Sequence, residues 1–534
     1  MQVSNFRGLW LILLIAAGLL GVLTLWRLEP RAGALWLNTA WLAAAACLIA
    51  LPVGGALAVL VFKTDTPGRS VAGLLLVGML FVPLYLIAGA WDAGFGLQGW
   101  HTLAAKTASG YEPWLRGWRA AIWVHALAAV PWVVLIVGAG LRAIEAEIEE
   151  DATTCATPAQ VLLHVSLPRA AAAFFVAGLW VAVVATAEIS VTDFFQVRTF
   201  AEEVYTQAAL GAFDFGGDEA LSASGLWIGL LLSAALAVAA IVAAGRLFTN
   251  FTDAALRPPW FGRIGRWRWP AAVVLWSIML LVAGLPLGNL IYKAGLSAEL
   301  ADSGVTRSWS PAKVALRMAA APAEFRGDLW LTFRVGAAAA TAALAIAIPL
   351  GWSMRSVRGV PWLRLTILAL CLTVPGPLLG VGLIRILNRP PESSLAVLAW
   401  LYDTNFAPWL AQTIRALPLA TLILWPALAS VPQAMLDTAA TEGSGPVSRL
   451  MRIALPQRWP AVAAAWLVAL AIAVGELAAT VLVIPPQRST AISVRIFQLL
   501  HYGVDDRVAA ISLVMVAGIA ALTAIAATLL KRRT

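Results

Sequence analysis

Charged side chains are scarce in this sequence of 534 residues. They make up 12% of the chain, whereas a soluble globular domain carries about 25%. Hydrophobic residues make up 61%. This composition excludes an ordinary soluble protein, and it leaves no soluble stretch long enough for a nucleotide-hydrolysing domain.

Cysteine and histidine are also scarce. Cys47, Cys155 and Cys371 are too few and too scattered for a disulfide framework or a thiolate metal site. The four histidines, which we interpret as non-ligands because they form no metal-ligand spacing, are His101, His125, His164 and His501. A GxxxxGK[ST] phosphate loop is missing as well. We therefore expect no metal site, no bound cofactor and no catalytic residue in this chain.

Long apolar stretches dominate the sequence instead. A membrane span needs about 20 mostly apolar residues, and we count about twelve such stretches. They are too long for barrel strands, and in lipid a helix satisfies its own backbone hydrogen bonds. The stretches lie near residues 8–26, 35–61, 71–91, 117–141, 171–193, 223–247, 271–294, 329–353, 360–386, 409–431, 460–484 and 509–530. The predicted fold is an all-α polytopic membrane protein.

Basic residues predict the orientation of these helices. They cluster after the second, sixth, eighth and twelfth stretches, at Lys63 and Arg69, at 246–268, at Arg355 and Arg358, and at 531–533. The positive-inside tendency makes that side cytoplasmic and places both termini inside. The net charge of +9 therefore reflects topology rather than nucleic-acid binding. Stretch 8–26 is longer than the apolar part of a signal peptide, so we expect a retained helix.

The chain is predicted to consist of two halves. Residues 251–270 are polar, basic and proline-containing, which is typical of a cytoplasmic linker. They separate a first six-helix half, 1–250, from a second, 271–534. With six helices each, the halves share one orientation and form parallel repeats about an axis along the membrane normal.

One polar pattern occurs once in each half. The first repeated segment, 149–168, reads EEDATTCATPAQVLLHVSLP, and the second, 436–456, reads LDTAATEGSGPVSRLMRIALP. Aligned on Pro168 and Pro456, the copies share an alanine, a threonine, a proline and a leucine; the matched pairs are Ala152 and Ala440, Thr153 and Thr441, Pro158 and Pro446, and Leu167 and Leu455. A duplicated cytoplasmic segment indicates two equivalent docking points for a partner.

Each repeated segment should contain two short helices. We expect Glu149, Glu150 and Asp151 in the first turn of a helix, where the helix dipole favours acids, and Asp437 in the same role in the second copy. Pro158 and Pro446, the latter within Ser-Gly-Pro, should break the run into two helices. Leu-Pro at 167–168 and 455–456 then ends the segment before the next span.

The pattern resembles the EAA loop of ABC-importer membrane subunits, E-A-A-x-x-x-G followed by Leu-Pro. The second copy matches through Asp437, Ala439, Ala440 and Gly443, which lies thirteen residues before Pro456. In the first copy Cys155 occupies the glycine position, and Glu-Glu-Asp-Ala at 149–152 replaces E-A-A. Two fused halves and stretches such as TDFFQVRTFAEEVY (192–205) narrow the resemblance to ferric-iron permeases.

The resemblance implies a permease without enzymatic activity. Two copies of a separate ATPase would dock on the repeated segments and bind the ATP. A periplasmic solute-binding protein would deliver ferric iron, or alternatively thiamine, sulfate, a polyamine or another small solute. The chain would lie in the cell inner membrane, surrounded by the lipid bilayer, and would bind no nucleic acid.

Acidic residues also stand inside two apolar stretches. Glu188 and Glu476 occupy equivalent positions twenty residues after the Leu-Pro motifs, and Asp193 lies slightly further on. Charges inside a bilayer are costly and usually face a cavity or a partner. They could line a translocation path for a cation, or pair structurally with Arg334, Arg385 or Arg415 or with a loop backbone. Both interpretations remain open.

Two other classes of protein compete with the permease. A secondary transporter would share the helix count but would normally lack twin cytoplasmic segments ending in Leu-Pro. A polytopic membrane enzyme would need a catalytic cluster at the membrane surface. The only acidic cluster, 145–151, falls within and just before the first repeated segment and has no metal-binding company.

Overall fold

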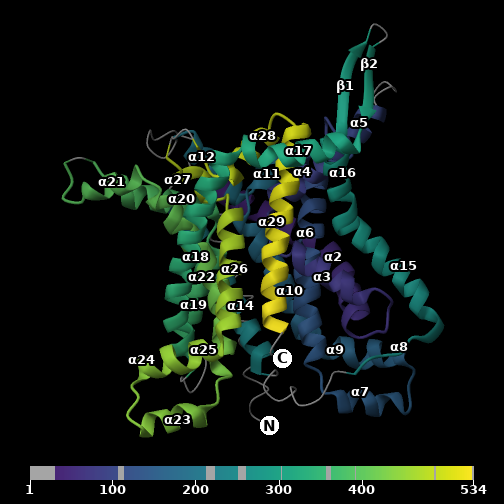
Figure 1. Ribbon diagram of the computed structural model, residues 1–534, viewed down its shortest axis with the longest axis vertical. Helices are drawn as coiled ribbons and strands as arrows, with labels where there is room; N and C mark the ends of the chain where they lie inside the picture. Colours follow the sequence, from purple (N-terminus) through teal and green to yellow (C-terminus); the bar gives the residue numbers. More distant parts are fainter. Residues whose placement is uncertain are drawn as a thin grey trace. The chain divides into compact units, whose positions relative to one another are not determined.

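The computed structural model describes residues 30–105, 113–211, 223–249, 260–301, 304–355, 362–390, 392–485 and 489–531. Within these ranges the chain is almost entirely helical (Figure 1). Six of the helices found there are long and apolar enough to cross a membrane, and four bent helix pairs raise the number of candidate spans to as many as ten. The chain is thus a helical, multi-pass membrane protein, as predicted.

Two compact units make up the chain, and neither is contiguous in sequence. Unit 1 comprises Met1–Arg69, Gly117–Ile278 and Leu372–Val381, and unit 2 comprises Ser70–Arg116, Met279–Cys371 and Gly382–Thr534. The predicted division into 1–250 and 271–534 follows chain order instead, and it stays a prediction. Of its linker, 251–270, the structure describes Trp260 onward.

The helices that lie wholly or mainly in unit 1 are α2 (Pro30–Phe62), α6 (Gly117–Arg142), α7 (Ala146–Thr153), α8 (Pro158–Val161), the π-helix η1 (Leu162–Ser166), α9 (Leu167–Arg169), α10 (Ala171–Ala187), α11 (Ser190–Phe194), α12 (Phe200–Ala209), α14 (Ala223–Thr249), the 3₁₀-helix η3 (Gly265–Trp267) and α15 (Arg268–Met279).

The elements of unit 2 begin with α3 (Arg69–Met79), α4 (Leu84–Phe95), α5 (Trp100–Ala105), the π-helix η4 (Leu280–Gly284), α16 (Leu285–Gly295), β1 (Leu296–Ala301), β2 (Gly304–Trp309), α17 (Pro311–Glu324), α18 (Arg326–Arg355) and α19 (Trp362–Thr373). After α20 (Gly376–Leu387), which is divided between the units, come α21 (Val397–Tyr402), α22 (Phe406–Ala429), α23 (Gln433–Thr441), α24 (Pro446–Arg449), the π-helix η5 (Leu450–Ala454), α25 (Leu455–Gln457), α26 (Trp459–Gly475), α27 (Thr480–Val483), α28 (Ile492–Leu500) and α29 (Asp506–Lys531).

Ten of the twelve predicted stretches correspond to the six long helices and the four bent pairs. Stretch 8–26 lies outside the described residues, and 223–247 matches α14, which is not among the ten. The total of twelve spans and the six-helix halves therefore stay predictions.

Four predicted spans are not single straight helices. Stretch 71–91 is α3 and α4, bent by 109°, and 360–386 is α19 and α20, bent by 101°. A proline stands at each break, Pro83 before α4 and Pro375 before α20, and proline removes a backbone donor and disfavours helix in the residue before it. The other two, 171–193 and 460–484, end as helices at Ala187 and Gly475.

The described part of the long loop at 295–328 departs from the all-α prediction. Strands β1 and β2 form an antiparallel hairpin that pairs Leu296 with Trp309 and Ala301 with Gly304. Helix α17 follows directly.

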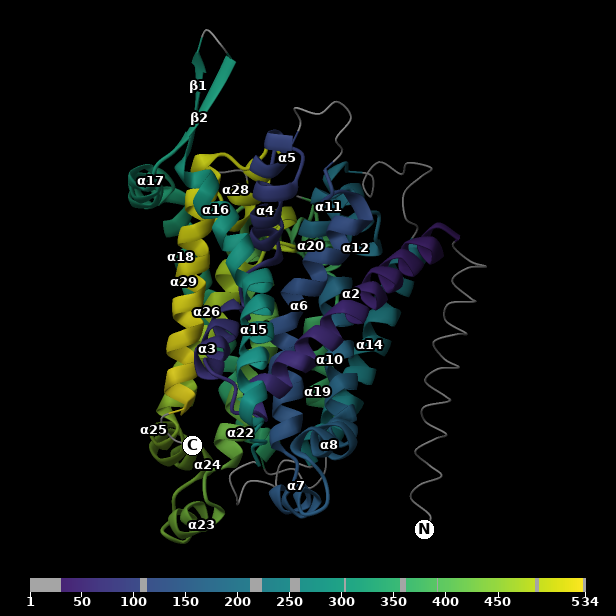
Figure 2. The ribbon, with the colours of Figure 1, turned by 90° about the vertical axis from the view of Figure 1, so that its right-hand side faces the viewer.

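Small residues let the helices of unit 1 approach closely. Helix α2 contacts α6 and α10, which also contact each other (Figure 2). A Cβ atom on Gly54 of α2 would lie 2.6 Å from Val133 of α6, and one on Gly138 of α6 would lie 2.2 Å from Phe62 of α2. Each glycine thus receives a large side chain of the other helix, a packing mode common in membranes.

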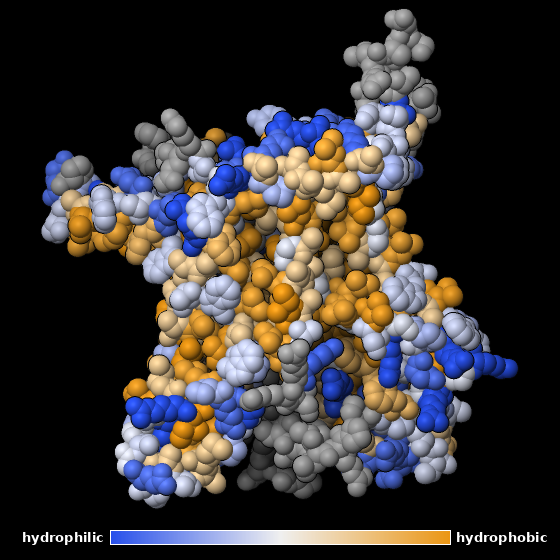
Figure 3. All heavy atoms as spheres, in the orientation of Figure 1, coloured by the Kyte–Doolittle hydropathy of each residue, from blue (hydrophilic) through white to orange (hydrophobic). Residues whose placement is uncertain are grey.

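Unit 2 has an alanine-rich core between α18, α22 and α26, formed by residues such as Ala343, Ala420 and Ala469. Leu436 and Leu450 of the second repeated segment pack into the same core. In Figure 3 the surface over α18 and α22 is mostly hydrophobic, whereas that over α23 and α24 mixes hydrophilic and hydrophobic residues.

We expect Gly54→Leu to destabilise unit 1, because its side chain would overlap Val133. Overpacking a closely packed core costs about 1–3 kcal/mol. The measurement is the thermal unfolding temperature of the purified protein in detergent, which should fall. Gly178→Ala is the matched control: its Cβ would lie 3.6 Å from Leu51, an ordinary contact, so its unfolding temperature should stay near wild type. Equal effects of the two changes would contradict this packing.

Candidate functional site

The two repeated segments fold into the same series of elements. Pro168 and Pro456 lie 288 positions apart, and a shift of 288 carries the bounds of α8, η1, α9 and α10 onto those of α24, η5, α25 and α26. Helices α7 and α23 also correspond, ending at Thr153 and Thr441. The sequence similarity therefore extends to the local structure of every element.

The predicted break into short helices is confirmed. Pro158 and Pro446 each stand at the first position of a four-residue helix, where a missing N–H costs nothing. The predicted place of the acids is only partly right. Helix α7 begins at Ala146, so Glu149 lies in its first turn but Glu150 and Asp151 follow it. Asp437 is likewise beyond the first turn of α23, which starts directly after Pro432.

The first repeated segment has Cys155 where the second has Gly443, and the backbone differs between these two positions. Gly443 has φ +85° and ends α23 in a Schellman motif, with its N–H donating to Ala440 and that of Ser444 donating to Ala439. Cys155 does not share the positive φ, because Gln196 is the only non-glycine residue of the described ranges that has one. The first copy uses a different turn, followed by a capping box between Thr157 and Gln160.

A π-helical turn follows in both copies, η1 and η5. Such turns are rare and often mark functional sites. Leu163 and Met451, at matching positions in these turns, are 60% and 58% exposed. Two large apolar side chains held outward at equivalent places are suited to contact a partner.

Most of the predicted docking residues are accessible. Exposed are Glu150, Asp151, Cys155, Pro168, Asp437, Ala440, Gly443, Pro446 and Pro456, and half-buried are Ala152, Pro158, Leu167, Ala439 and Leu455. Glu149 is the exception, because its side chain is completely buried.

Glu149 belongs to a buried polar cluster. Its Oε2 accepts from Lys63 Nζ at 2.5 Å, and its Oε1 accepts from Ser166 Oγ at 2.6 Å. Lys63 follows the last residue of α2, and Ser166 ends η1. Burial lowers the pKa of the Lys63 ammonium, and the Glu149 carboxylate opposes that shift. The cluster ties α7 to both neighbouring elements, so Glu149 holds the segment in place instead of facing a partner.

The described part of the predicted linker covers this cluster. Lys63 Nζ lies 6.0 Å from the centre of the Trp260 ring, and the N–H of Gly262 donates to the Lys63 carbonyl at 2.9 Å. The N–H of Ile264 donates to Asp65 Oδ1 at 3.0 Å. Residues 260–264 thus pack on the end of α2.

Among the described residues, no matching cluster is found at the second repeated segment. Ala454 occupies the position of Ser166, and Asp437 is exposed and accepts from its own helix neighbour Gln433 at 2.7 Å. Two arginines bind the backbone just before the segment: Arg355 donates to the Val431 carbonyl at 2.7 Å and Arg458 to that of Ser430 at 2.8 Å. The acid is therefore internal in one copy and available to a partner in the other.

Glu188 and Glu476 do not stand inside helices as predicted. Each ends a helix, α10 or α26, and accepts hydrogen bonds from the N–H groups that begin the next one. Glu188 accepts from Ser190 N at 2.6 Å and from Val191 N at 3.1 Å. Glu476 accepts from Ala479 N at 2.8 Å and from Thr480 N at 3.0 Å.

Side chains complete the two caps. The hydroxyls of Ser190 and Thr480 also donate to the carboxylates of Glu188 and Glu476, respectively. His125 Nε2 lies 3.7 Å from Glu188 Oε2, a contact that the sequence did not indicate. This geometry fits the structural alternative, pairing with a loop backbone, and a role in a translocation path stays a prediction.

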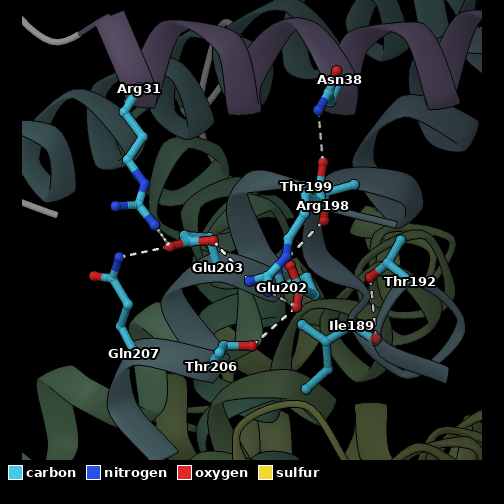
Figure 4. Close-up of polar contacts among 10 residues, drawn as sticks. All are labelled: Arg31, Asn38, Ile189, Thr192, Arg198, Thr199, Glu202, Glu203, Thr206 and Gln207. Carbon is cyan, nitrogen blue, oxygen red and sulfur yellow. Dashed lines mark hydrogen bonds and ion pairs between the residues drawn. The ribbon is translucent and has the colours of Figure 1, made fainter. Parts of the chain in front are cut away.

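Asp193 lies in α11. The next helix, α12, carries a cluster of charged side chains that sequence reasoning missed (Figure 4). Glu203 Oε1 accepts from Arg31 at 2.6 Å and from Gln207 at 2.7 Å, while its Oε2 accepts from Arg198 at 3.1 Å. Arg198, Thr206 and Gln207 are close to these acids in sequence, but the sequence gave no signal for Arg31, which lies 172 positions before Glu203.

Glu202 is the unusual member of this cluster. Its Oε1 accepts from Thr206 at 2.9 Å, but its buried Oε2 has no hydrogen-bond partner in the part of the chain that the structure describes. Burial raises the pKa of Glu202 to about 7, against the opposing effects of the Thr206 hydrogen bond and the Arg198 charge.

No family model matches the chain, and no curated protein matches it either. In the described ranges, no three His, Cys, Asp or Glu side chains are grouped so that they could hold a metal ion.

We expect Lys63→Met to loosen α7, because it leaves Glu149 buried without its cation. Removing one partner of a buried ion pair costs about 3–5 kcal/mol. Hydrogen exchange of residues 146–153, read by mass spectrometry, should become faster. The double change Lys63→Met with Glu149→Met should restore much of the protection, and Asp437→Asn should leave 433–441 nearly unchanged. Wild-type exchange of α7 in Lys63→Met would refute the cluster's role.

Glu202 should make the stability of unit 1 depend on pH. Its pKa of about 7 lies above its usual 4.5, so folding takes up a proton. The resulting stabilisation is complete below about pH 4.5 and is lost as the pH rises through 7. The unfolding temperature in detergent should therefore fall between pH 5 and pH 8, and Glu202→Gln should fall less. Identical pH profiles for both proteins would rule out this contribution.

Proposed function

We propose that this chain is the membrane-spanning permease subunit of an ABC importer. The observation that carries the proposal is the pair of repeated segments. Each presents an exposed large apolar residue, Leu163 or Met451, on the same π-helical turn. Each is followed directly by an apolar helix, so force applied to the segment would reach the membrane-embedded part.

The partner that fits these segments is an ATPase dimer with two grooves on the cytoplasmic side. ATP binding would close the dimer and move both segments, shifting the permease between inward- and outward-facing states. Such a shift requires that each partner bind the two states with different affinity. The resemblance to the EAA loop supports this partner. Both termini of the two fused halves would then lie in the cytoplasm, as the basic residues predict.

The cargo that we propose is ferric iron, delivered by a periplasmic binding protein across the inner membrane. The resemblance to ferric-iron permeases supports this choice, while thiamine, sulfate or a polyamine would use the same permease mechanism. The capping roles of Glu188 and Glu476 are compatible with iron transport, because carboxylates engaged by backbone N–H groups would not trap so hard a cation.

Uptake of radiolabelled Fe3+ tests the cargo. Cells lacking the gene should lose iron uptake, regain it on complementation, and lose it again when ATP is depleted. Thiamine and sulfate uptake should be unaffected. Loss of uptake of another solute would change the proposed cargo but leave the permease proposal standing. Uptake that survives ATP depletion would favour a secondary transporter.

Crosslinking tests the docking itself. A photoreactive group on Leu163→Cys or Met451→Cys in native membranes should form an adduct with a protein that carries a GxxxxGK[ST] loop. Leu316→Cys, on α17, is the control, because it is 68% exposed but lies outside both segments. An adduct pattern that is the same at all three positions would count against docking.

Gly443 offers a sharp test of the second segment. Gly443→Trp should insert normally but abolish uptake, because a bulky side chain would occupy the docking face and the positive φ is strained for it by about 1–2 kcal/mol. Gly445 lies two residues away with φ −68° and equally open surroundings, so Gly445→Ala should have a much smaller effect. Wild-type uptake by a well-expressed Gly443→Trp variant would contradict the proposal that the second repeated segment docks the ATPase.

A further inference from the structure

A pocket of ≈ 300 Å³ opens between the N-terminal parts of α18 and α22, both in unit 2. Most of its lining is apolar, with Leu331, Val335 and Ala338 on one side and Trp409 on the other. Two polar side chains also line it, Arg334 and Asn405. A mostly apolar pocket with a few polar groups is typical of a ligand site.

In the part of the chain that the structure describes, neither polar group makes an ion pair or a side-chain hydrogen bond. Arg334 lies over the Trp330 ring, 5.7 Å from its centre, and neither an ion pair nor a side-chain hydrogen bond is found for it there. The Asn405 side-chain amide likewise makes no hydrogen bond within these ranges. Arg334 was one of the cations predicted to pair with Glu188 or Glu476, and that pairing is absent among the described contacts.

The depth of Arg334 argues for a ligand from the membrane. Helix α18 has 30 residues and is about 45 Å long, which matches a bilayer with its headgroup layers. Arg334 lies eight residues from the start of this helix, or about 12 Å along its axis. A long side chain at that depth reaches the boundary between headgroups and hydrocarbon. A guanidinium there is costly unless an anion accompanies it.

The surrounding surface is also typical of a lipid-facing boundary. Trp330 and Phe333 beside Arg334 are 58% and 49% exposed, and aromatic residues gather at the headgroup level. Ala338 and Ile346 lie farther along α18, toward the middle of the helix, and both are exposed.

We propose that this pocket binds one anionic phospholipid. The lipid phosphate receives hydrogen bonds from the Arg334 guanidinium and the Asn405 amide. Arginine suits this role, because its planar fork can bind two phosphate oxygens at once. The first part of an acyl chain covers Leu331, Val335 and Ala338 against Trp409. The inference needs only the membrane character of the chain and is independent of the permease function.

The test is native mass spectrometry of the full purified chain, titrated with phosphatidylglycerol or phosphatidylcholine. The wild type should bind a first phosphatidylglycerol at least fivefold more tightly than phosphatidylcholine. Arg334→Ala should remove that preference, and Arg334→Lys should keep part of it. The matched control is Arg326→Ala, on the exposed first residue of the same helix and outside the pocket, which should bind both lipids as the wild type does.

A second measurement keeps the proposal testable if Arg334→Ala folds poorly. Phosphatidylglycerol with a photoreactive group near its phosphate should label the wild-type chain within 330–338 and 405–409. Unchanged lipid preference in folded Arg334→Ala, an equal loss in Arg326→Ala, or labelling only outside these two ranges would each overturn the proposal.

Discussion

Backbone N–H and C=O groups inside a membrane must form hydrogen bonds within the protein. Two apolar stretches of this chain end as helices at a glutamate that accepts such hydrogen bonds. Glu188 and Glu476 show how. Each carboxylate accepts two N–H groups of the next short helix and one hydroxyl. The chain can therefore end a helix within an apolar stretch and begin another while the carboxylate pairs two of the freed N–H groups.

The need to pair buried polar groups also explains how the two repeated segments differ. A buried carboxylate needs both a counter-charge and a hydrogen-bond donor, and Glu149 has them in Lys63 and Ser166. In the second copy the position that matches Ser166 is Ala454, which offers no side-chain donor, and Asp437 is exposed to water. Equivalent backbones thus carry chemically different surfaces, and a partner that binds both must tolerate an inward acid in one and an outward acid in the other.

Much of the fold could be read from sequence. Apolar length predicted about twelve helical stretches, ten of which correspond to candidate spans, and the Pro158 and Pro446 pattern predicted two short helices in each repeated segment. Sequence could not show that two stretches end as helices before Glu188 and Glu476, because the capping of these breaks depends on local geometry around the two carboxylates. It could not place Lys63 against Glu149 either, since 86 residues separate them. The Arg334 pocket was missed for the same reason, because Arg334 and Asn405 are far apart in sequence.

The burial of the Lys63 amine means that its chemical reactivity can be used to follow local movement. The ammonium is fully buried, with the Trp260 ring over it and Gly262 bound to its carbonyl. An acylating reagent that attacks free amines therefore cannot reach it while residues 260–264 stay in place. Modification of this lysine therefore measures how often the segments around it, residues 260–264 and α7, move away from the end of α2.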